Sequence, residues 1–433
     1  MANNMFTRWQ AITLWKRVLI ALLLGVIIGL SAHYGGFSGA ITKWIKPFGQ
    51  AFVNLIKMLI VPLIVVTLVS GVVAMGDPKR LGSLGVKTIA LYMGTTLFAV
   101  TLGLIFGTLF QPGIGVEFIG VDEGTRAMLA ERVSADTPSI TQRLLAIIPT
   151  NPIKAMVEGD ILAVIFFSIL IGVGIIAVGE KAEPLKSFFQ SAEEVVMKIT
   201  LFVMELAPIG VFALIAWVMA EMGLGILKAL GMLTIALYLA CFVHIVLVYG
   251  GLIVRTILKL PLARFFYGVL DAQGVAYSTA SSSATLPASI SCAQDNLGID
   301  ESVAGSVLPL GATINMDGTA IYLGLIALFS AQALGIDLSM VDYVMIAMTA
   351  TLTSIGAAGI PSASLFLAFA VLGTFGVTLD QYTLIIAFIL PFDRLLDMMR
   401  TVTNVTGDLA VASVVAKWEG QLDEDVFKAK SVV

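Results

Sequence analysis

The chain has 433 residues, of which 58% are hydrophobic and only 12% charged, with a mean hydropathy of +0.98. Because a soluble domain carries roughly 25% charged residues, this composition excludes a soluble globular protein and indicates an integral membrane protein. The net charge of -4 comes with no basic patch beyond short loop clusters, which argues against nucleic acid as a partner. Cys241 and Cys292 have no paired spacing, so we read both as packing residues.

Several apolar runs reach the roughly 20 residues that a helix needs to cross a bilayer core, and no alternating pattern suggests a barrel. The first run continues without a small-residue cleavage site, so it is read as a spanning helix and not as a signal peptide. The pattern predicts six spanning helices in the first part of the chain, near residues 17–34, 49–76, 86–110, 155–179, 190–220 and 228–258.

Basic residues fall on alternate connections between these helices, which predicts that those connections are cytoplasmic. The chain is therefore expected to be a multi-pass protein of the inner (cytoplasmic) membrane with both termini on the cytoplasmic side. The basic residues are Arg8, Lys16, Arg17, Lys79, Arg80, Lys87, Lys181, Lys186, Arg255, Lys259 and Arg264. The acidic segment 111–154 is expected to be a polar loop on the other side.

From about residue 263 the apolar segments become short and are broken by small and polar residues. Segments 277–287 (YSTASSSATLP) and 353–364 (TSIGAAGIPSAS) each lie between two apolar arms. Each segment is typical of a re-entrant hairpin, whose irregular backbone is tolerated at membrane depth only beside protein or a wet cavity. The two tips are therefore expected to face a site.

Each hairpin is followed by a helix with a polar interruption, at Asn315 to Thr319 and at Asn404 to Asp408. The sequence predicts that both helices are broken there and that the two hairpin-plus-helix units have opposite orientations in the membrane. Such inverted, interrupted repeats point to a secondary transporter with its site near the midplane.

The last helix carries its polar side chains on one face, because their spacing follows the 3.6-residue period. A charge facing lipid would cost roughly 3 kcal/mol, so this face is expected to line a protected site. The residues are Asp393, Asp397, Arg400, Thr401, Asn404 and Asp408.

Simpler readings of these motifs also exist. The serines from Ser281 to Ser283 could serve only helix packing, and Gly318 and Gly407 could simply kink their helices. Asp317 is harder to explain in this way, because packing does not require a carboxylate within a membrane helix.

Four motifs, SSSATLP, PLGATINMDGT, SIGAAGIP and DMMRTVTNVTGD, resemble the glutamate transporter family, the dicarboxylate/amino acid:cation symporters, and the likeness spans nearly the whole chain. It implies an all-α integral membrane protein with eight transmembrane helices plus two re-entrant hairpins. It also implies a homotrimer in the lipid bilayer that works as an elevator-type transporter and not as an enzyme. Residues 1–262 would form the scaffold and part of the transport domain, residues 263–418 the transport core, and residues 419–433 a cytoplasmic tail.

The resemblance also implies the substrate, a small acidic amino acid such as aspartate or glutamate. An arginine suits its distal carboxylate, and an aspartate one turn earlier suits its ammonium. By motif, the substrate-binding residues are Ser281, Ser282, Thr319, Ile360, Asp397, Arg400, Thr401 and Asn404.

One feature departs from the family. Its members carry an additional arginine at the position of Ala280 or at that of Met398, and neither arginine is present here. Arg394 could substitute in part, although its offset from Arg400 places it on another face of the helix. Aspartate versus glutamate preference and potassium counter-transport stay open.

Sodium ions are expected to be co-transported, because hard cations prefer carboxylate, carbonyl and hydroxyl oxygens. The motifs suggest three sets of ligands. The first set is Asp408 with the backbone carbonyls of Gly311, Asn315 and Asn404, the second is the carbonyls of Thr313, Ser354, Ile355 and Ala357, and the third is Tyr92, Thr95 and Thr96 with Asn315 and Asp317. In the alternative reading, Asp317 or Asp408 is neutralised by a proton.

Other functions have less support. A serine hydrolase on Ser281 to Ser283 needs a base, and the only histidines, His33 and His244, lie on helices expected in the other half. A channel would favour rings of like charge. The substrate of a C4-dicarboxylate carrier has no ammonium to pair with Asp397. The substrate of a neutral amino acid carrier has no distal carboxylate to pair with Arg400.

Overall fold

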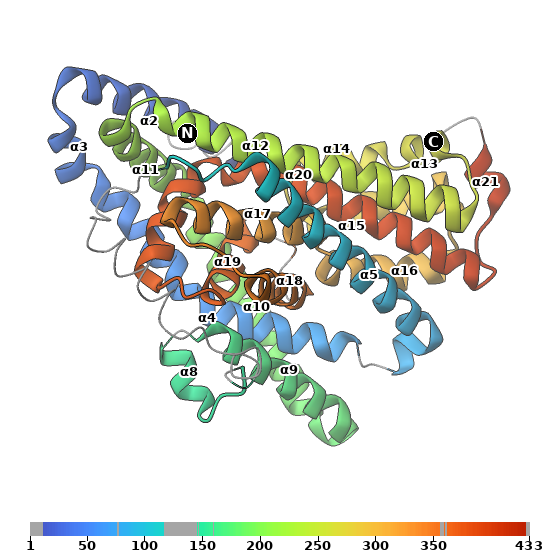
Figure 1. The fold of residues 1–433 in the computed structure, drawn as a ribbon. Coiled ribbons are helices and arrows are strands. Elements are labelled where there is room, and N and C mark those ends of the chain that lie inside the picture. Colours follow the sequence, from blue (N-terminus) through green and yellow to red (C-terminus); the bar gives the residue numbers. More distant parts are fainter. Residues whose placement is uncertain are drawn as a thin grey trace, which may run out of the picture.

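The residues that the computed structural model describes, 12–75, 78–116, 145, 147–158, 160–355, 359 and 362–429, are mostly helical. Figure 1 shows the arrangement of the helices. Within these ranges the one β-type pairing is an isolated bridge between Ile299 and Leu422. Most of the acidic loop expected at 111–154 lies outside the described residues.

Within the described residues, the first part of the chain forms eleven helical elements up to residue 258. They are α2 (Leu14–Gly35), α3 (Ser38–Trp44), α4 (Lys46–Met75), α5 (Pro78–Phe110), α8 (Pro152–Glu158), α9 (Ile161–Val178), η1 (Gly179–Ala182), α10 (Glu183–Glu205), α11 (Ala207–Met222) and α12 (Gly225–His244), after which the π-helix η2 (Ile245–Leu258) continues α12.

The prediction of a single helix at 190–220 is wrong, because the helix is interrupted at Leu206, between α10 and α11. Pro208 lies in the first turn of α11, where its missing N–H has no helical partner to lose. The apolar run continues across the break, so hydropathy alone did not reveal it. In the part of the chain that the structure describes, six helical stretches are long and apolar enough to cross a membrane: Lys16–Gly35, Lys46–Val73, Gly85–Phe110, Ala163–Glu205, Leu227–Leu258 and Glu301–Leu334.

The second part of the chain contains two helical hairpins, α14 with α15 and α18 with α19. Its elements are α13 (Leu262–Gly268), α14 (Leu270–Thr279), α15 (Ser282–Ser291), the π-helix η3 (Cys292–Asn296), α16 (Glu301–Ile314), α17 (Asp317–Leu334), α18 (Met340–Ile355), α19 (Ala363–Gly373), α20 (Leu379–Trp418) and α21 (Glu424–Lys428).

The two predicted helix interruptions differ. The chain leaves helical geometry at Asn315 and Met316, between α16 and α17, as expected. By contrast α20 runs without a break from Leu379 to Trp418, so the interruption expected at Asn404 to Asp408 is wrong. Glycine at position 407 provides room for a neighbouring side chain there and does not unwind the helix.

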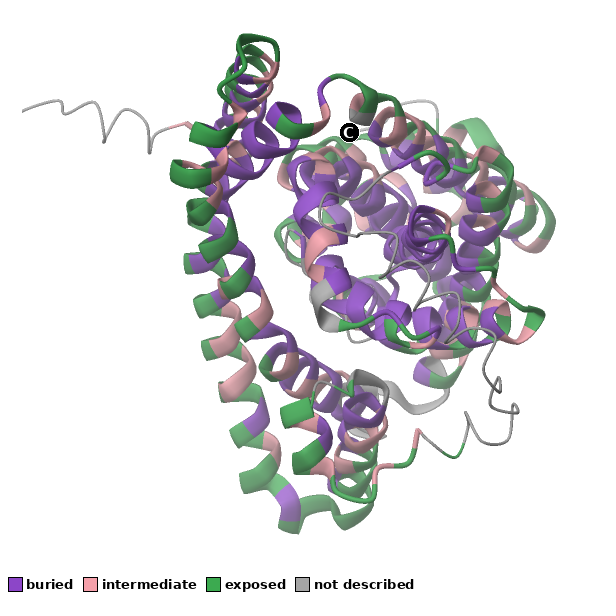
Figure 2. Ribbon diagram, turned by 60° about the vertical axis from the view of Figure 1, so that its left-hand side comes forward, coloured by how far each residue is buried: buried purple, intermediate pink, exposed green. Residues whose placement is uncertain are grey.

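The helices pack in two groups. In the first, α2 lies along α11, and α4 packs against α9, α10 and α11. In the second, α17 packs against α5 and α20, and α20 also contacts α12, α14 and α16. Figure 2 shows the difference in burial, with many exposed residues along the first group and a largely buried interior in the second. The polar residues predicted to form the site lie in the second group.

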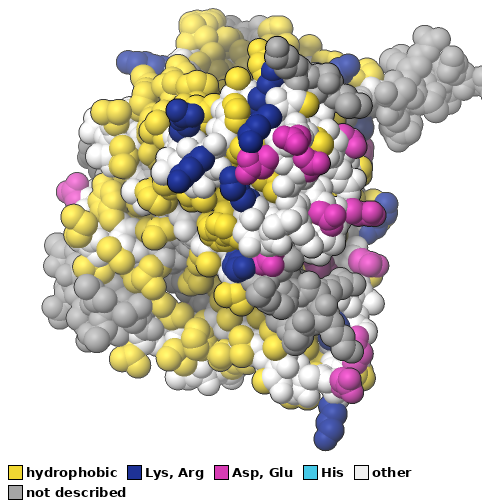
Figure 3. Space-filling model, turned by 90° about the vertical axis from the view of Figure 1, so that its right-hand side faces the viewer, with side chains coloured by type: hydrophobic (Ala, Val, Ile, Leu, Met, Phe, Trp, Pro, Cys, Tyr) yellow, Lys and Arg dark blue, Asp and Glu magenta, His cyan; other side chains and the backbone are white. Residues whose placement is uncertain are grey.

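The C-terminal segment returns to the ends of the second group and holds them by polar contacts. Asp423 donates its N–H to the Gly298 carbonyl at 2.8 Å, and Lys417 bonds the Leu258 carbonyl at 2.7 Å. Lys417 and Lys428 also hold the pKa of Glu424 down at about 2 through hydrogen bonds to its carboxylate. Figure 3 looks at this side of the molecule, where charged side chains gather next to an apolar surface.

Candidate functional site

The centre of the candidate site is Arg400, whose side chain is fully buried on α20. Its Nη2 lies 2.8 Å from Asp397 Oδ1 and 3.0 Å from Asp393 Oδ1. Helical spacing explains the contact, since residues three and seven positions apart share a face. The sequence predicted this shared face, but it assigned Asp397 and Arg400 to different parts of a ligand, whereas here they pair with each other.

Arg400 keeps capacity for a further anion. Its guanidinium carbon lies 4.0 Å from the centre of the Tyr322 ring, an arrangement that favours a cation. Its Nε and Nη1 have no hydrogen-bond partner among the described residues, and neither has Asp393 Oδ2. Buried N–H groups are normally paired, so the free Nη1 marks a place where an incoming carboxylate gains a charge-assisted hydrogen bond.

The two hairpins meet over this cluster. Ser281 Oγ donates to the Gly359 carbonyl at 2.6 Å, and the Ser283 N–H donates to the same carbonyl at 3.3 Å. From the second hairpin, the Ser362 N–H donates to Asp397 Oδ2 at 2.7 Å. The tips are therefore closed on each other and on α20, and the hydrogen bonds of the serines go to backbone rather than to a base.

The other predicted substrate residues are buried in the same region. Thr401 donates to the Asp397 carbonyl at 2.9 Å, and the Asn404 side-chain oxygen accepts the Gly318 N–H at 2.7 Å. Gly318 must be small, because a Cβ there would lie 2.2 Å from the Arg400 carbonyl oxygen. Ser282 and Thr319 are also buried, whereas Ile360 lies outside the described residues.

The first set of proposed cation ligands comes together around Asp408. Its Oδ1 accepts a hydrogen bond from Asn315 Nδ2 at 2.9 Å, and the same Nδ2 lies 3.3 Å from the Asn404 carbonyl. A Cβ on Gly311 would lie 2.5 Å from Asp408 Oδ1, so the backbone of α16 approaches this carboxylate closely. The Asn315 side-chain oxygen is buried with no hydrogen-bond partner among the described residues. The geometry thus gathers oxygen atoms of the kind that a hard cation prefers.

In the third set, Thr96 contacts Asp317, which is fully buried at the start of α17. Thr96 donates to Asp317 Oδ1 at 2.6 Å. Nearby, Thr95 donates to the Tyr92 carbonyl at 3.1 Å, and the Tyr92 hydroxyl donates to the Val307 carbonyl at 3.3 Å.

The second set is only partly described. Ala357 lies outside the described residues, and for Ile355 the backbone alone is described. Thr313 donates to the Leu310 carbonyl, and Ser354 donates to the Thr351 carbonyl, each within its own helix. A Cβ on Gly359 would lie 2.7 Å from the Ala312 carbonyl, so the second hairpin does reach the end of α16.

Two residues of the Asp317 cluster were missed by sequence reasoning. Tyr249 donates to Asp317 Oδ2 at 2.6 Å, and His244 Nε2 lies 3.1 Å from the same oxygen. The expectation that His244 lies apart from the second half is therefore wrong. The cause is local winding: the π-helix begins at Ile245, and its hydrogen bonds between residues five apart bring Tyr249 edge-to-face with His244, with ring centres 4.7 Å apart. The 3.6-residue period of a regular helix separates such a pair.

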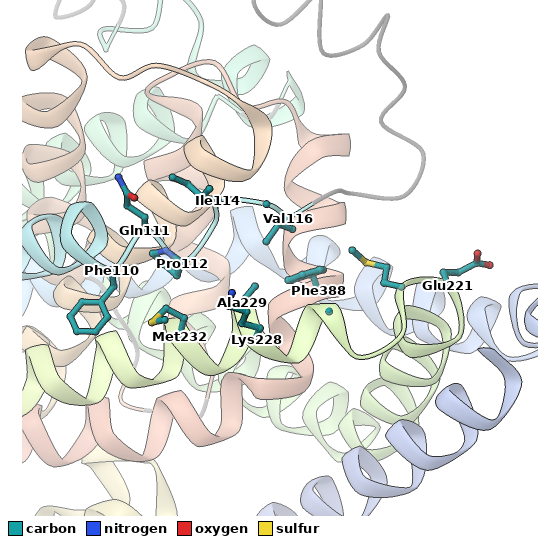
Figure 4. Close-up of a pocket in the computed structure, with 13 residues that line it drawn as sticks. Phe110, Gln111, Pro112, Ile114, Val116, Glu221, Lys228, Ala229, Met232 and Phe388 are labelled. Atoms are coloured by element: carbon teal, nitrogen blue, oxygen red, sulfur yellow. The ribbon is translucent and has the colours of Figure 1, made fainter. Parts of the chain in front are cut away.

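A cavity of about 750 Å³ lies elsewhere, and none of the predicted site residues lines it. As Figure 4 shows, it is bordered by the end of α5 and the start of α12, with Phe110, Gln111, Lys228 and Met232 on its wall. The closed hairpin tips account for this separation, because their contacts leave the Arg400 cluster buried.

Comparison with known proteins gives a consistent result. Residues 14–418 match the sequence model described as "Sodium:dicarboxylate symporter family". The "Proton/sodium-glutamate symport protein" of Bacillus subtilis (strain 168) is 35% identical over 421 residues, covering 96% of this chain and 95% of the relative. The "Proton/glutamate-aspartate symporter" of Escherichia coli (strain K12) is 36% identical over 415 residues, covering 94% and 93%. The "C4-dicarboxylate transport protein" of Azorhizobium caulinodans is 34% identical over 420 residues, covering 96% and 91%.

Proposed function

The chain belongs to the sodium:dicarboxylate symporter family, and we propose that it takes up aspartate or glutamate by symport with sodium ions. The coarser part of this statement, a multi-pass membrane symporter for glutamate-like or dicarboxylate substrates, rests on the family and on the long apolar helices. The choice of an acidic amino acid rests on one observation: Asp397 and Arg400 lie together, buried, beneath the two hairpin tips.

Binding would proceed by exchange of partners. The distal carboxylate of the substrate would take the free Nη1 donor of Arg400 together with the Nη2 donor that Asp397 gives up, and the ammonium would take Asp397 in its place. Ser281, Ser282 and Ile360 at the tips, with Thr319, Thr401 and Asn404, would complete the site around the other carboxylate and the backbone of the ligand. In this exchange Arg400 and Asp397 would each keep a partner of opposite charge, while the second carboxylate of the ligand would be held by hydrogen bonds.

Sodium as the coupling ion is supported by the two further carboxylates. Asp317 and Asp408 contact only hydroxyl, amide and imidazole groups among the described residues, and no lysine or arginine lies against them. A buried carboxylate without a fixed counter-charge attracts a cation, and the surrounding oxygens suit sodium. We propose cation sites at the first and third ligand sets, and a further one at Thr313, Ser354, Ile355 and Ala357.

The second candidate is a proton-coupled carrier or a C4-dicarboxylate carrier, since some relatives carry these names. Asp397 argues against the C4-dicarboxylate assignment, because succinate has no ammonium to pair with this carboxylate. Proton coupling would instead neutralise Asp317 or Asp408 by protonation.

The assembly proposed with this function is a homotrimer in the inner membrane with both termini in the cytoplasm. Residues 1–262 would supply the scaffold and part of the transport domain, and residues 263–418 the core that moves as an elevator. The residues after 418 would form a cytoplasmic tail. The separate packing of α2, α4, α9, α10 and α11 from the α17 and α20 group supports such a division.

The test is uptake of labelled aspartate and glutamate into liposomes at fixed pH, with an inward sodium gradient or with choline in its place. The proposal predicts uptake only with sodium and competition by the other acidic amino acid, with much weaker competition by succinate or serine. Undiminished uptake in choline would refute sodium coupling, and preferential competition by succinate would favour the C4-dicarboxylate carrier.

A further inference from the structure

Arg394 is a second buried arginine on α20 that the proposed substrate site does not use. It is only 8% exposed, and it lies six residues before Arg400, about a third of a turn away around the helix. Its Nη2 donates to the Thr279 carbonyl at 3.0 Å, while its Nε has no hydrogen-bond partner among the described residues. Burying a guanidinium for so few hydrogen bonds is costly, so the residue calls for an explanation.

The carbonyl that Arg394 binds is the last one of α14, the first arm of the first hairpin. Ala280 follows in the left-handed conformation, with φ of 51°, and ends the helix. The last carbonyls of a helix lack intrahelical partners and carry the negative end of its dipole, so a cation stabilises them. Arg394 therefore caps the first arm of this hairpin from the last helix.

The capped carbonyl lies close to the contact between the hairpins. Ser281, two residues further on, donates through its hydroxyl to the Gly359 carbonyl of the second hairpin at 2.6 Å. Arg394 also shares the wall of a small cavity, about 20 Å³, with Ser362, whose N–H binds Asp397. One guanidinium thus touches the first hairpin and borders the residue that ties the second hairpin to α20.

We propose that Arg394 is a positioning residue that holds the tip of the first hairpin in register with the second hairpin and with Asp397. It acts on the substrate through Ser281 and Gly359 and does not contact the substrate itself. The effect on substrate affinity rests on the proposed function, whereas the effect on hairpin spacing does not. The guanidinium of Arg394 suits this task because it is planar, donates hydrogen bonds in fixed directions and stays charged.

The experiment compares full-length protein with Arg394, Arg394→Lys and Arg394→Gln, each with spin labels at Ser278→Cys on α14 and Leu352→Cys on α18. Both label positions are exposed, and the native cysteines are buried. In ligand-free protein we expect a narrow distance distribution for Arg394 and a broader, longer one for Arg394→Gln. Arg394→Lys should restore part of the narrow distribution, because an ammonium still caps the carbonyl. Sodium-dependent aspartate binding should weaken by about tenfold in Arg394→Gln and by less in Arg394→Lys.

The matched control is Arg17→Gln, which removes a buried arginine from the first group of helices, where it pairs with Glu205. It should leave both the hairpin distances and the aspartate affinity as in the parent. Should Arg394→Gln not fold, Arg394→Leu fills the same space without charge and gives the same comparison. Unchanged hairpin distances in folded Arg394→Gln or Arg394→Leu overturn the proposal. If the parent binds no aspartate, the proposed function fails, while the distance measurement still decides the role of Arg394.

Discussion

The second group of helices contains two acidic clusters that are built in different ways. Asp393 and Asp397 surround a guanidinium, with both carboxylates within 3.0 Å of Arg400 Nη2. Asp317 and Asp408 lie equally deep, but their partners are Thr96, Tyr249, Asn315 and the imidazole of His244 instead of a lysine or arginine.

The difference separates two tasks. The cluster with its own counter-charge can exchange that partner for a charged ligand, so it suits a substrate that carries both an ammonium and carboxylates. The cluster without a lysine or arginine leaves two carboxylates to be neutralised inside a membrane, so it suits a cation taken from solution. In the proposed function, coupling would require that both clusters be filled.

The largest expected effect comes from Arg400→Gln, which leaves Asp393 and Asp397 buried without their shared cation. Uptake of aspartate should fall by at least about a hundredfold, because a buried charge pair loses one partner. The thermal midpoint should also fall. Adding Asp393→Asn to this variant should recover the thermal midpoint but not uptake. Near-normal aspartate affinity in Arg400→Gln would contradict the role given to this arginine.

The second effect is Asp408→Asn, which acts on the other cluster. The sodium concentration for half-maximal uptake should rise by about tenfold or more. The Hill coefficient for sodium should fall by about one, because one cation site is lost. Asp393→Asn is the control, since it changes the substrate cluster and should leave the sodium slope as it was. An unaltered sodium slope in Asp408→Asn would show that this carboxylate does not bind the coupling ion.

The third prediction separates the role of Asp397 from that of Arg400 within the substrate cluster. Asp397→Asn should weaken competition by aspartate by about tenfold or more, because the ammonium loses its carboxylate. Competition by succinate, which has no ammonium, should change by less than about threefold. Equal losses for the two competitors would mean that Asp397 is structural, through its bonds to Arg400 and Ser362.

The fourth prediction concerns the glycine that makes room in the cation cluster. A Cβ on Gly407 would lie 2.5 Å from the Tyr249 hydroxyl and 2.7 Å from Asn315 Nδ2. Gly407→Ala should therefore displace Tyr249 from Asp317 and raise the half-saturating sodium concentration about threefold to tenfold. Gly274→Ala, with open space around its Cβ, is the matched control and should have little effect.

The smallest expected effect lies outside both clusters. Glu424 accepts hydrogen bonds from Lys417 and Lys428, which lower its pKa from 4.5 to about 2. Because the pKa of Glu424 is lower in the folded state, the ionised carboxylate stabilises that state at pH values above its usual pKa of 4.5. This contribution should disappear only as the pH falls from about 4.5 to 2. At neutral pH Glu424→Gln should lower the thermal midpoint by no more than about 2 °C, since exposed ion pairs contribute little. A thermal scan at pH 7 checks this, and a larger drop would mean that α21 holds the core more tightly than its surface contacts indicate.

The face of α20 could be predicted from the sequence, because the 3.6-residue period alone places Asp393, Asp397 and Arg400 together. Their pairing with each other could not, since spacing does not say which partner a charged side chain takes. The helix interruption at Leu206 could not be predicted from hydropathy, because apolar residues flank it on both sides. The same period assigned Arg394 to another face, but only the folded hairpin shows what that face contacts.

The Asp317 cluster shows a different limit. Asn315 and Asp317 were identified because polar residues in an apolar helix need an explanation. His244 and Tyr249 were missed because the π-helix that brings them together follows no regular period. Likewise, Gly407 was read as a break in α20, whereas its lack of a side chain serves the neighbouring Tyr249.

Sodium binding to the ligand-free protein tests the division between the two clusters most directly. Binding to purified full-length protein can be followed by calorimetry, with choline as the control cation. We predict that the parent and the Asp393→Asn/Arg400→Gln variant bind sodium, and that the Asp317→Asn/Asp408→Asn variant does not. Sodium binding that persists without Asp317 and Asp408, or that is lost with Asp393 and Arg400, would contradict the account.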